Sequence, residues 1–156
     1  GVINYVTPST PTRSGGFLTL APGNQHYFNG HLRLGAPVGR SGLLFDYVRK
    51  QGDGARENIG SRLNDLNLKA LIALGGHQSL SLRGNYYSED SRVTYSGLTE
   101  AEFQADPRQN PFQNDSMLLD RWGASASHRL GLSQTGSLTT TAYGYIVSRN
   151  WWREAW

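Results

Sequence analysis

The sequence predicts an all-β protein: an antiparallel up-and-down meander of about seven strands, part of a transmembrane β-barrel. Two observations predict this fold. Apolar and polar residues alternate over stretches of about ten residues, which is the pattern of a strand with two different faces. Short turns also alternate with longer connections along the chain, as they do in barrels of the outer-membrane type.

The alternation is strict in some of the expected strands and weaker in others. It is strict in 27–36, 66–74, 79–87 and 121–130. It is less regular in 43–49 and 138–148, which are nevertheless rich in strand-forming residues, and 16–21 is a shorter candidate. The expected short turns lie near 37–41, 75–78 and 131–136, and the expected long connections are 51–62 and 88–117.

A soluble antiparallel sandwich would alternate too, but the composition of the two faces favours the membrane barrel. The polar face carries charge in the middle of strands, at Arg33, Lys69, Arg83 and Arg121, while the apolar face contains Gly and Ala. A charged wall suits a barrel interior, and a lipid-facing wall needs apolarity without close packing. Aromatic residues are expected at strand ends, where they would form an interfacial girdle.

Composition excludes several other functions. The chain contains no Cys, so disulfides, Cys-ligated zinc and a cysteine nucleophile are excluded. The formal net charge is +3 with dispersed basic residues, which does not indicate a nucleic-acid partner. The four His residues lack metal-ligand spacing, and no catalytic constellation is visible. We therefore expect no enzyme, no catalytic residue, no metal site and no resident cofactor.

Three segments resemble one known family. Residues 1–7, Gly-Val-Ile-Asn-Tyr-Val-Thr, resemble the last strand of the plug domain in TonB-dependent outer-membrane receptors. Residues 61–69 (Ser-Arg-Leu-Asn-Asp-Leu-Asn-Leu-Lys) resemble a barrel strand of the ferric dicitrate and ferric siderophore receptors within that family. Residues 97–109, Gly-Leu-Thr and then Phe and Asp-Pro-Arg-Gln, resemble a long extracellular loop of the same group.

The resemblance implies a fold and a function. It implies a 22-stranded barrel around a plug, with residues 1–10 as the end of the plug and 11–156 as an incomplete N-terminal part of the barrel. It also implies a multi-pass protein of the Gram-negative outer membrane, in contact with lipid, that imports a ferric siderophore or a ferric citrate-like chelate. Transport would be energised by the TonB–ExbB–ExbD complex through an N-terminal part that this segment lacks.

The connection 88–117 is the most informative stretch for ligand binding. Thr99 and Glu102 have the spacing of a capping box, which predicts a short helix over about 99–105. A ferric chelate is often anionic, and the planar Arg fork binds carboxylates in a bidentate manner. The candidate ligand residues on the extracellular side are Arg56, Arg92, Arg108, Arg149 and Arg153. For each of them, solvation or an ion pair with a neighbouring carboxylate is the alternative.

Two other functional classes remain open from the residues alone. A passive outer-membrane porin would share the barrel but would lack a plug. A soluble β-rich ligand-binding module would share the alternation. The plug-like motif at residues 1–7 argues against both, since neither needs such a strand.

Overall fold

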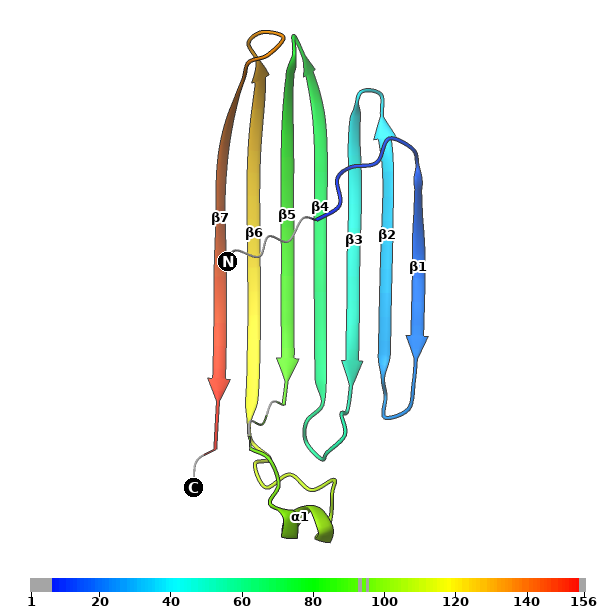
Figure 1. Cartoon of the computed structure of the whole chain (residues 1–156), viewed down its shortest axis with the longest axis vertical. Coiled ribbons are helices and arrows are strands. Elements are labelled where there is room, and N and C mark those ends of the chain that lie inside the picture. The colour runs from blue at the N-terminus through cyan, green and yellow to red at the C-terminus, as the bar shows by residue number, and fades with distance from the viewer. Residues whose placement is uncertain (1–6, 93, 95, 155–156) are drawn as a thin grey trace.

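The computed structural model describes residues 7–92, 94 and 96–154, and within them the chain forms one antiparallel sheet. The strands lie side by side in sequence order, from β1 to β7 (Figure 1). Their bounds are β1 Gly15–Pro22, β2 Phe28–Val38, β3 Ser41–Gly52, β4 Ser61–Gly75, β5 Gln78–Ser91, β6 Ser116–Gly131 and β7 Ser137–Trp152. A short helix, α1 (Glu100–Ala105), lies between β5 and β6. The predicted meander is thereby confirmed.

The two ends of the sheet differ in their connections. At one end, here called the turn end, β2–β3, β4–β5 and β6–β7 are joined by short turns (Figure 1). Gly76 and His77 both have positive φ, +53° and +60°, as a two-residue type I′ hairpin turn requires. At the other end, the loop end, lie the connections 23–27, 53–60 and 92–115. The predicted alternation of short turns and long connections is confirmed.

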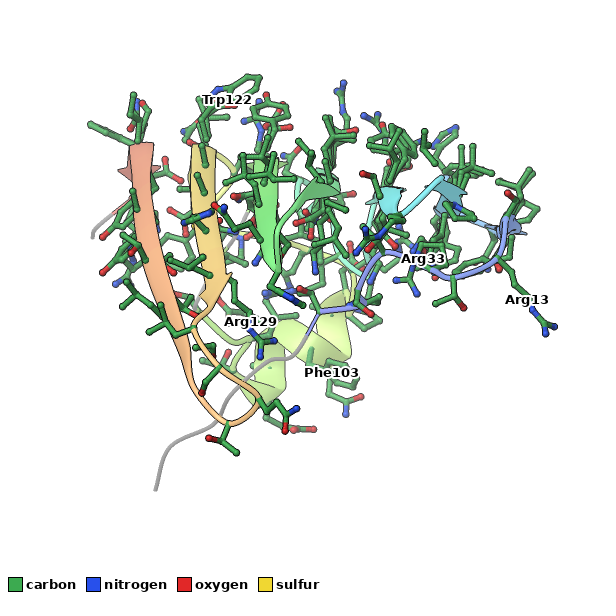
Figure 2. The ribbon with its side chains drawn as sticks, turned by 90° about the horizontal axis from the view of Figure 1, so that it is seen from above. Arg13, Arg33, Phe103, Trp122 and Arg129 are labelled. Atoms are coloured by element: carbon green, nitrogen blue, oxygen red, sulfur yellow. The ribbon has the colours of Figure 1, made fainter. Side chains whose placement is uncertain are left out.

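The strand register gives the sheet one apolar and one polar face. Leu32, Tyr47, Leu66, Tyr86 and Trp122 are on one face, joined by pairing from β2 to β6. The residues between them are on the other face, which carries the predicted charges. Figure 2 shows Trp122 on one side of the sheet and Arg33 and Arg129 on the opposite side.

Neither face is covered by a second layer in the described residues. Leu43, Leu68 and Ile146, all on the apolar face, are 53%, 48% and 76% exposed. A β-sandwich would bury such residues against a facing sheet. The described chain is therefore a single layer, which does not support the sandwich alternative.

The strands extend further at the loop end than the alternation predicts. Loops were expected over 51–62 and 88–117, whereas the structure has 53–60 and 92–115. The reason lies on the apolar face: beyond Tyr47 and Tyr86 its residues become polar, so both faces look alike and the alternation disappears. For the same reason Tyr86 and Trp122 lie within long strands and not at strand ends.

The segment before β1 lies on the polar face. It crosses in front of β2, β3 and β4 (Figure 1). The Lys69 ammonium donates to Thr7 Oγ1 and to Pro8 O, both at 2.5 Å. A Cβ added at Gly35 would lie 2.5 Å from Pro11 Cγ, and one at Gly42 would lie 3.0 Å from Thr10 Cβ. Lys69 and these two glycines form a seat for residues 7–11.

Candidate functional site

The connections at the loop end form one hydrogen-bonded unit, here called the loop assembly (residues 23–27, 53–60 and 92–115). The amide of Asp53 donates to Gln25 O at 2.9 Å, which joins the first two connections. The amide of Glu57 donates to Arg108 O at 2.7 Å, which joins the second to the third. Because loop backbone is paired in this way, the three connections hold one another in place.

Helix α1 begins as its sequence predicts. Thr99 is the N-cap residue, and its Oγ1 accepts a hydrogen bond from the amide of Glu102 at 3.3 Å. The Glu102 carboxylate in turn accepts from the Thr99 amide at 2.7 Å, which completes the capping box. The predicted helix over about 99–105 is confirmed. Its Phe103 is 52% exposed, so the helix presents an apolar side chain to the surroundings of the loop assembly.

The best-buried polar residues of the described chain are Ser91, at the end of β5, and Asn110 and Asp115, at the base of the third connection. Asn110 and Asp115 are each 3% exposed. Asn110 Oδ1 accepts from the amide of Phe112 at 3.1 Å, and Asp115 Oδ1 accepts from the amide of Glu154 at 2.6 Å. The Glu154 carboxylate accepts from the Asn114 side chain at 2.7 Å. The Asn110 bond stays within the loop, and the bonds of Asn114 and Asp115 to Glu154 join the loop to the chain that follows β7.

The polar face below the loop assembly is linked by hydrogen bonds and ion pairs across the strands. Asp46 on β3 pairs with Arg33 and accepts from His31 Nε2 at 3.2 Å, both on β2. Arg83 on β5 donates to Asn67 Oδ1 on β4 at 3.1 Å. His31 thus lies in a polar wall, as its position in the alternation predicts.

A hollow of about 680 Å³ lies along β5–β7. Arg83 and Arg121 line it, together with Tyr143 and Tyr145, which are 80% and 71% exposed. The hollow therefore presents cationic and aromatic side chains on the polar face of the sheet. It offers no metal site: no group of three or more His, Cys, Asp or Glu side chains capable of holding a metal occurs among the described residues.

The structure separates the five candidate arginines into three places. Arg56 and Arg108 belong to the loop assembly, where Arg56 Nη2 donates to Ser96 O at 3.1 Å. Arg149 and Arg153 both lie near the Trp151 ring, with guanidinium carbons 4.8 and 6.0 Å from its centroid. Arg92 also belongs to the loop assembly, since its amide donates to Gly60 O at 2.9 Å, but its side chain lines a different hollow, which it shares with residues of the apolar face. The sequence predicts that these residues lie near one end of the sheet, but it does not predict which of them lie close together.

Two side chains of the loop assembly have shifted pKa values. The pKa of His26 is raised above its ordinary value because its Nδ1 lies 2.5 Å from the Asp53 carboxylate, which bonds it and attracts its charge. The pKa of Glu102 is lowered because its carboxylate accepts from the backbone and then the side chain of Thr99. Both groups are solvent-exposed.

Sequence reasoning missed several residues that shape this end of the molecule. Arg49 and Arg62 were not singled out, although they line the same hollow as Arg92. A signal was present: extending the alternation past Tyr47 and Leu66 places both on the apolar face, where charge is unexpected. The contact between Asp115 and Glu154 had no such signal, because the two residues are 39 positions apart in irregular chain.

Comparison with known proteins gives a match in structure but not in sequence. No protein-family model matches the chain, and no curated protein matches it. A crystal structure of the ferric citrate transporter FecA in its unliganded form matches 99% of this chain with a TM-score of 0.84 and 22% identity. The chain spans about a quarter of that transporter's length, 24%.

The match establishes the fold. The chain is an all-β antiparallel meander whose fold is like that of the matched part of the transporter. The matched protein is named as a transporter. None of the described helices is long and apolar enough to cross a membrane.

Proposed function

We propose that this chain forms part of the barrel of a TonB-dependent receptor that binds a ferric chelate and imports it across the outer membrane of a Gram-negative bacterium. The observation that carries the proposal is the superposition of nearly the whole chain on a ferric citrate transporter. The division of the sheet into one apolar and one charged face supports it, because a transmembrane barrel needs both.

The two faces suggest how the sheet would lie in the membrane. The apolar face contacts lipid, and the polar face lines the interior. The turn end lies in the periplasm and the loop end outside the cell, as in barrels of this type. Open strand edges are costly in hydrocarbon, so β1 and β7 need further strands beside them to complete the barrel.

Residues 1–10 are proposed as the end of the plug domain and 11–156 as the start of the barrel. Residues 1–6 of the plug-like motif lie outside the described residues. Support comes from residues 7–11, which lie against the polar face on the seat formed by Lys69, Gly35 and Gly42. A segment that leaves a plug inside the barrel must lie on this face. The TonB–ExbB–ExbD complex is the proposed partner on the periplasmic side.

The proposed ligand is an anionic ferric chelate, either a siderophore or a ferric citrate-like complex. Arg56 and Arg108 on the loop assembly, and Arg149 and Arg153 beside Trp151, are the candidate contacts. Arg92 is a weaker candidate, because it shares its hollow with apolar-face residues. Bidentate contact with carboxylates is the chemistry that these side chains offer.

The test is uptake of ⁵⁵Fe-labelled citrate and of labelled siderophores by cells that express the full-length protein. We expect uptake that disappears when tonB is deleted. Ion conductance in planar bilayers that is independent of TonB, without uptake, would instead indicate a passive porin. Purification as a monomer without detergent would indicate a soluble module, and either result would overturn the proposal.

The ligand residues are tested by two paired variants of the same protein. Replacing an Arg that donates charged hydrogen bonds to a carboxylate should weaken chelate binding by about tenfold or more. R56Q/R108Q and R149Q/R153Q identify which pair contacts the chelate, as measured by equilibrium binding in detergent. Arg40→Gln in the β2–β3 turn is the matched control. If both pairs bind like the control, these arginines are not the ligand residues.

A further inference from the structure

The apolar face of the sheet changes character along a row of residues that crosses the strands. Tyr47, Leu66, Tyr86, Trp122 and Ile146 are successive partners from β3 to β7. Tyr86 stacks on Trp122 with ring centroids 4.1 Å apart. Amphipathic aromatic rings prefer the boundary between hydrocarbon and headgroups. This aromatic row therefore marks the depth at which the proposed barrel leaves the hydrocarbon.

The tyrosine hydroxyls of the row point towards the loop end. Tyr47 donates to Asn64 Oδ1 at 2.8 Å, and Tyr86 donates to Asp120 Oδ1 at 2.9 Å. Asn64 and Asp120 are both two residues beyond the row on its loop side. The apolar parts of the rings thus adjoin the leucines, while their polar atoms meet polar side chains.

Directly beyond the row, on the same face, lies a charged hollow of about 420 Å³. We call it the rim hollow and define it by its charged or titratable residues, which are His26, Arg49, Asp53, Arg62, Asp90 and Arg92. Arg49 is two residues past Tyr47, and Arg62 is four residues from Leu66. At about 3.3 Å per residue these positions lie about 7 to 13 Å along the strands from the row.

At this distance from the aromatic row, Arg49 and Arg62 reach the depth of the lipid headgroups. With strands tilted by about 35–45°, the guanidinium-bearing residues lie about 5 to 10 Å above the hydrocarbon boundary. The headgroup layer of one leaflet is about 5 to 8 Å thick. Arg49 and Arg62 therefore face lipid headgroups and not the barrel interior.

The rim hollow has an excess of positive charge. Asp53 is bonded to His26 at 2.5 Å. Among the described residues, Arg49 donates to neutral amides, to Asn64 Oδ1 at 2.9 Å and Gln51 Oε1 at 3.0 Å. In the part of the chain that the structure describes, the Arg62 and Arg92 side chains have no hydrogen bond or ion pair. Asp90 lies opposite Arg62 across the β4–β5 pairing and is the remaining carboxylate.

A second hollow lies on the apolar side of the row, on the same strands. It measures about 710 Å³, and its lining includes Leu34, Leu43, Phe45, Leu68 and Leu82. Gly84 adds an open position to it, since a Cβ there would meet nothing within 4 Å. An apolar trough that leads to a cationic hollow has the chemistry of a lipid: acyl chains on one side of the boundary and a phosphate on the other.

We propose that the rim hollow binds the phosphate group of a membrane lipid whose acyl chains lie in the apolar hollow of β2–β5. Guanidinium groups bind phosphate through paired, charge-assisted hydrogen bonds. The side chains of Arg62 and Arg92 make no hydrogen bond to the rest of the described chain, so their donors are available for this role, and Arg49 supplies further positive charge. The inference rests on the proposed function, because it needs the apolar face to contact lipid.

The experiment is native mass spectrometry of the full-length protein in a neutral detergent with added dimyristoyl phosphatidic acid. We expect the wild-type protein to retain this lipid and to bind dimyristoyl phosphatidylcholine more weakly. Arg62→Gln removes a side chain that has no hydrogen bond or ion pair among the described residues, so it should leave the fold intact and weaken retention by about tenfold. R49Q/R62Q should weaken it further, and Arg40→Gln at the turn end is the control.

Unchanged retention in Arg62→Gln and R49Q/R62Q would overturn the inference. Displacement of the lipid by inorganic phosphate at similar concentration would also overturn it, because the site would then be one for free phosphate. Concentration-dependent dimers that form on this face and exclude the lipid would identify a second copy as the occupant. Insertion into lipid vesicles, measured by flotation of the same preparation, tests the membrane assignment separately.

Discussion

The two faces of the sheet are made from the same strands but are stabilised by different interactions. On the polar face, side chains bond across the strands, as Asp46 does with Arg33 and His31. On the apolar face, Leu68 and Leu82 stay 48% and 38% exposed. One face thus supplies its own polar partners, whereas the other requires an apolar surrounding to cover it.

This difference shows that neighbouring residues of one strand are each suited to the surroundings of their own face. Ser81 and Leu82 are neighbours on β5, yet each faces a different surrounding. Ser81 pairs with Leu71 and Ser127, and Leu82 pairs with Ala70 and Ala126. Both residues lie in the middle of the same strand with a partner strand on each side, so a difference between their mutants reports mainly on the surroundings of each side chain.

The largest expected effect on stability therefore comes from placing a charge on the apolar face of β5, compared with the same charge on its polar face. Leu82→Arg should lower the free energy of unfolding by about 2 to 4 kcal/mol, because it places a guanidinium in hydrocarbon. Ser81→Arg should change it far less, since the polar face already holds Arg83 and Lys69. The measurement is denaturant unfolding of the full-length protein in phospholipid vesicles. Equal losses for the two variants would contradict the assignment of the faces.

The next effect concerns the seat of residues 7–11. Gly35→Ala places a Cβ 2.5 Å from Pro11 Cγ and should cost about 1 to 3 kcal/mol or displace the segment. Gly84→Ala, on the apolar face, meets nothing within 4 Å and should stay within about 0.5 kcal/mol of wild type.

Displacement from the seat can be measured directly because the chain has no Cys. A Ser9→Cys label should become more accessible to a thiol reagent in the Gly35→Ala background and not in the Gly84→Ala background. Equal accessibility in the two backgrounds, without a difference in stability, would mean that residues 7–11 do not depend on this seat.

The two faces were predictable from the sequence, whereas the contacts between distant loops were not. Alternation depends on neighbouring residues, so it correctly places Arg33, His31 and Leu82 without any knowledge of the fold. The capping box of Thr99 and Glu102 is local for the same reason, and the predicted helix is present.

The ends of the strands were less predictable because their surroundings are polar on both faces. Arg62 extends the alternation of β4 with a charged residue, and the sequence therefore suggested a loop there, whereas Arg49 was the last residue of the expected strand 43–49. The bond between Asp115 and Glu154 and the seat of residues 7–11 depend on chain brought together by the fold. Local pattern does not contain that information. The division of the five candidate arginines among three places follows from the same long-range contacts.

A smaller effect is expected at the aromatic row, where the apolar face ends. Trp122→Ala removes a ring stacked on Tyr86, and we expect a loss of about 1 kcal/mol beyond the lost burial. Tyr143→Ala is the control on the polar face, because that ring is 80% exposed and should contribute little. Unfolding in vesicles measures both. A larger loss for Tyr143→Ala would show that the boundary has been placed on the wrong face.

The smallest expected effects are opposite pH responses at two places in the loop assembly. The raised pKa of His26 means that its bond to Asp53 stabilises the first two connections below the ordinary value of 6.5, and that this contribution is lost as pH rises through the raised value. The lowered pKa of Glu102 means that its cap on α1 is complete above the ordinary value of 4.5 and is lost as pH falls through the lowered value.

Hydrogen exchange, corrected for the intrinsic effect of pH, should therefore show residues 23–27 loosening above neutral pH and 100–105 loosening in acid. His26→Gln and Glu102→Gln should each abolish the response at its own site and leave the other unchanged. A common response of both segments would mean that the loop assembly opens as one unit. The hydrogen bonds that join 23–27 to 53–60 and 53–60 to 92–115 would then control its motion more strongly than either titrating group does.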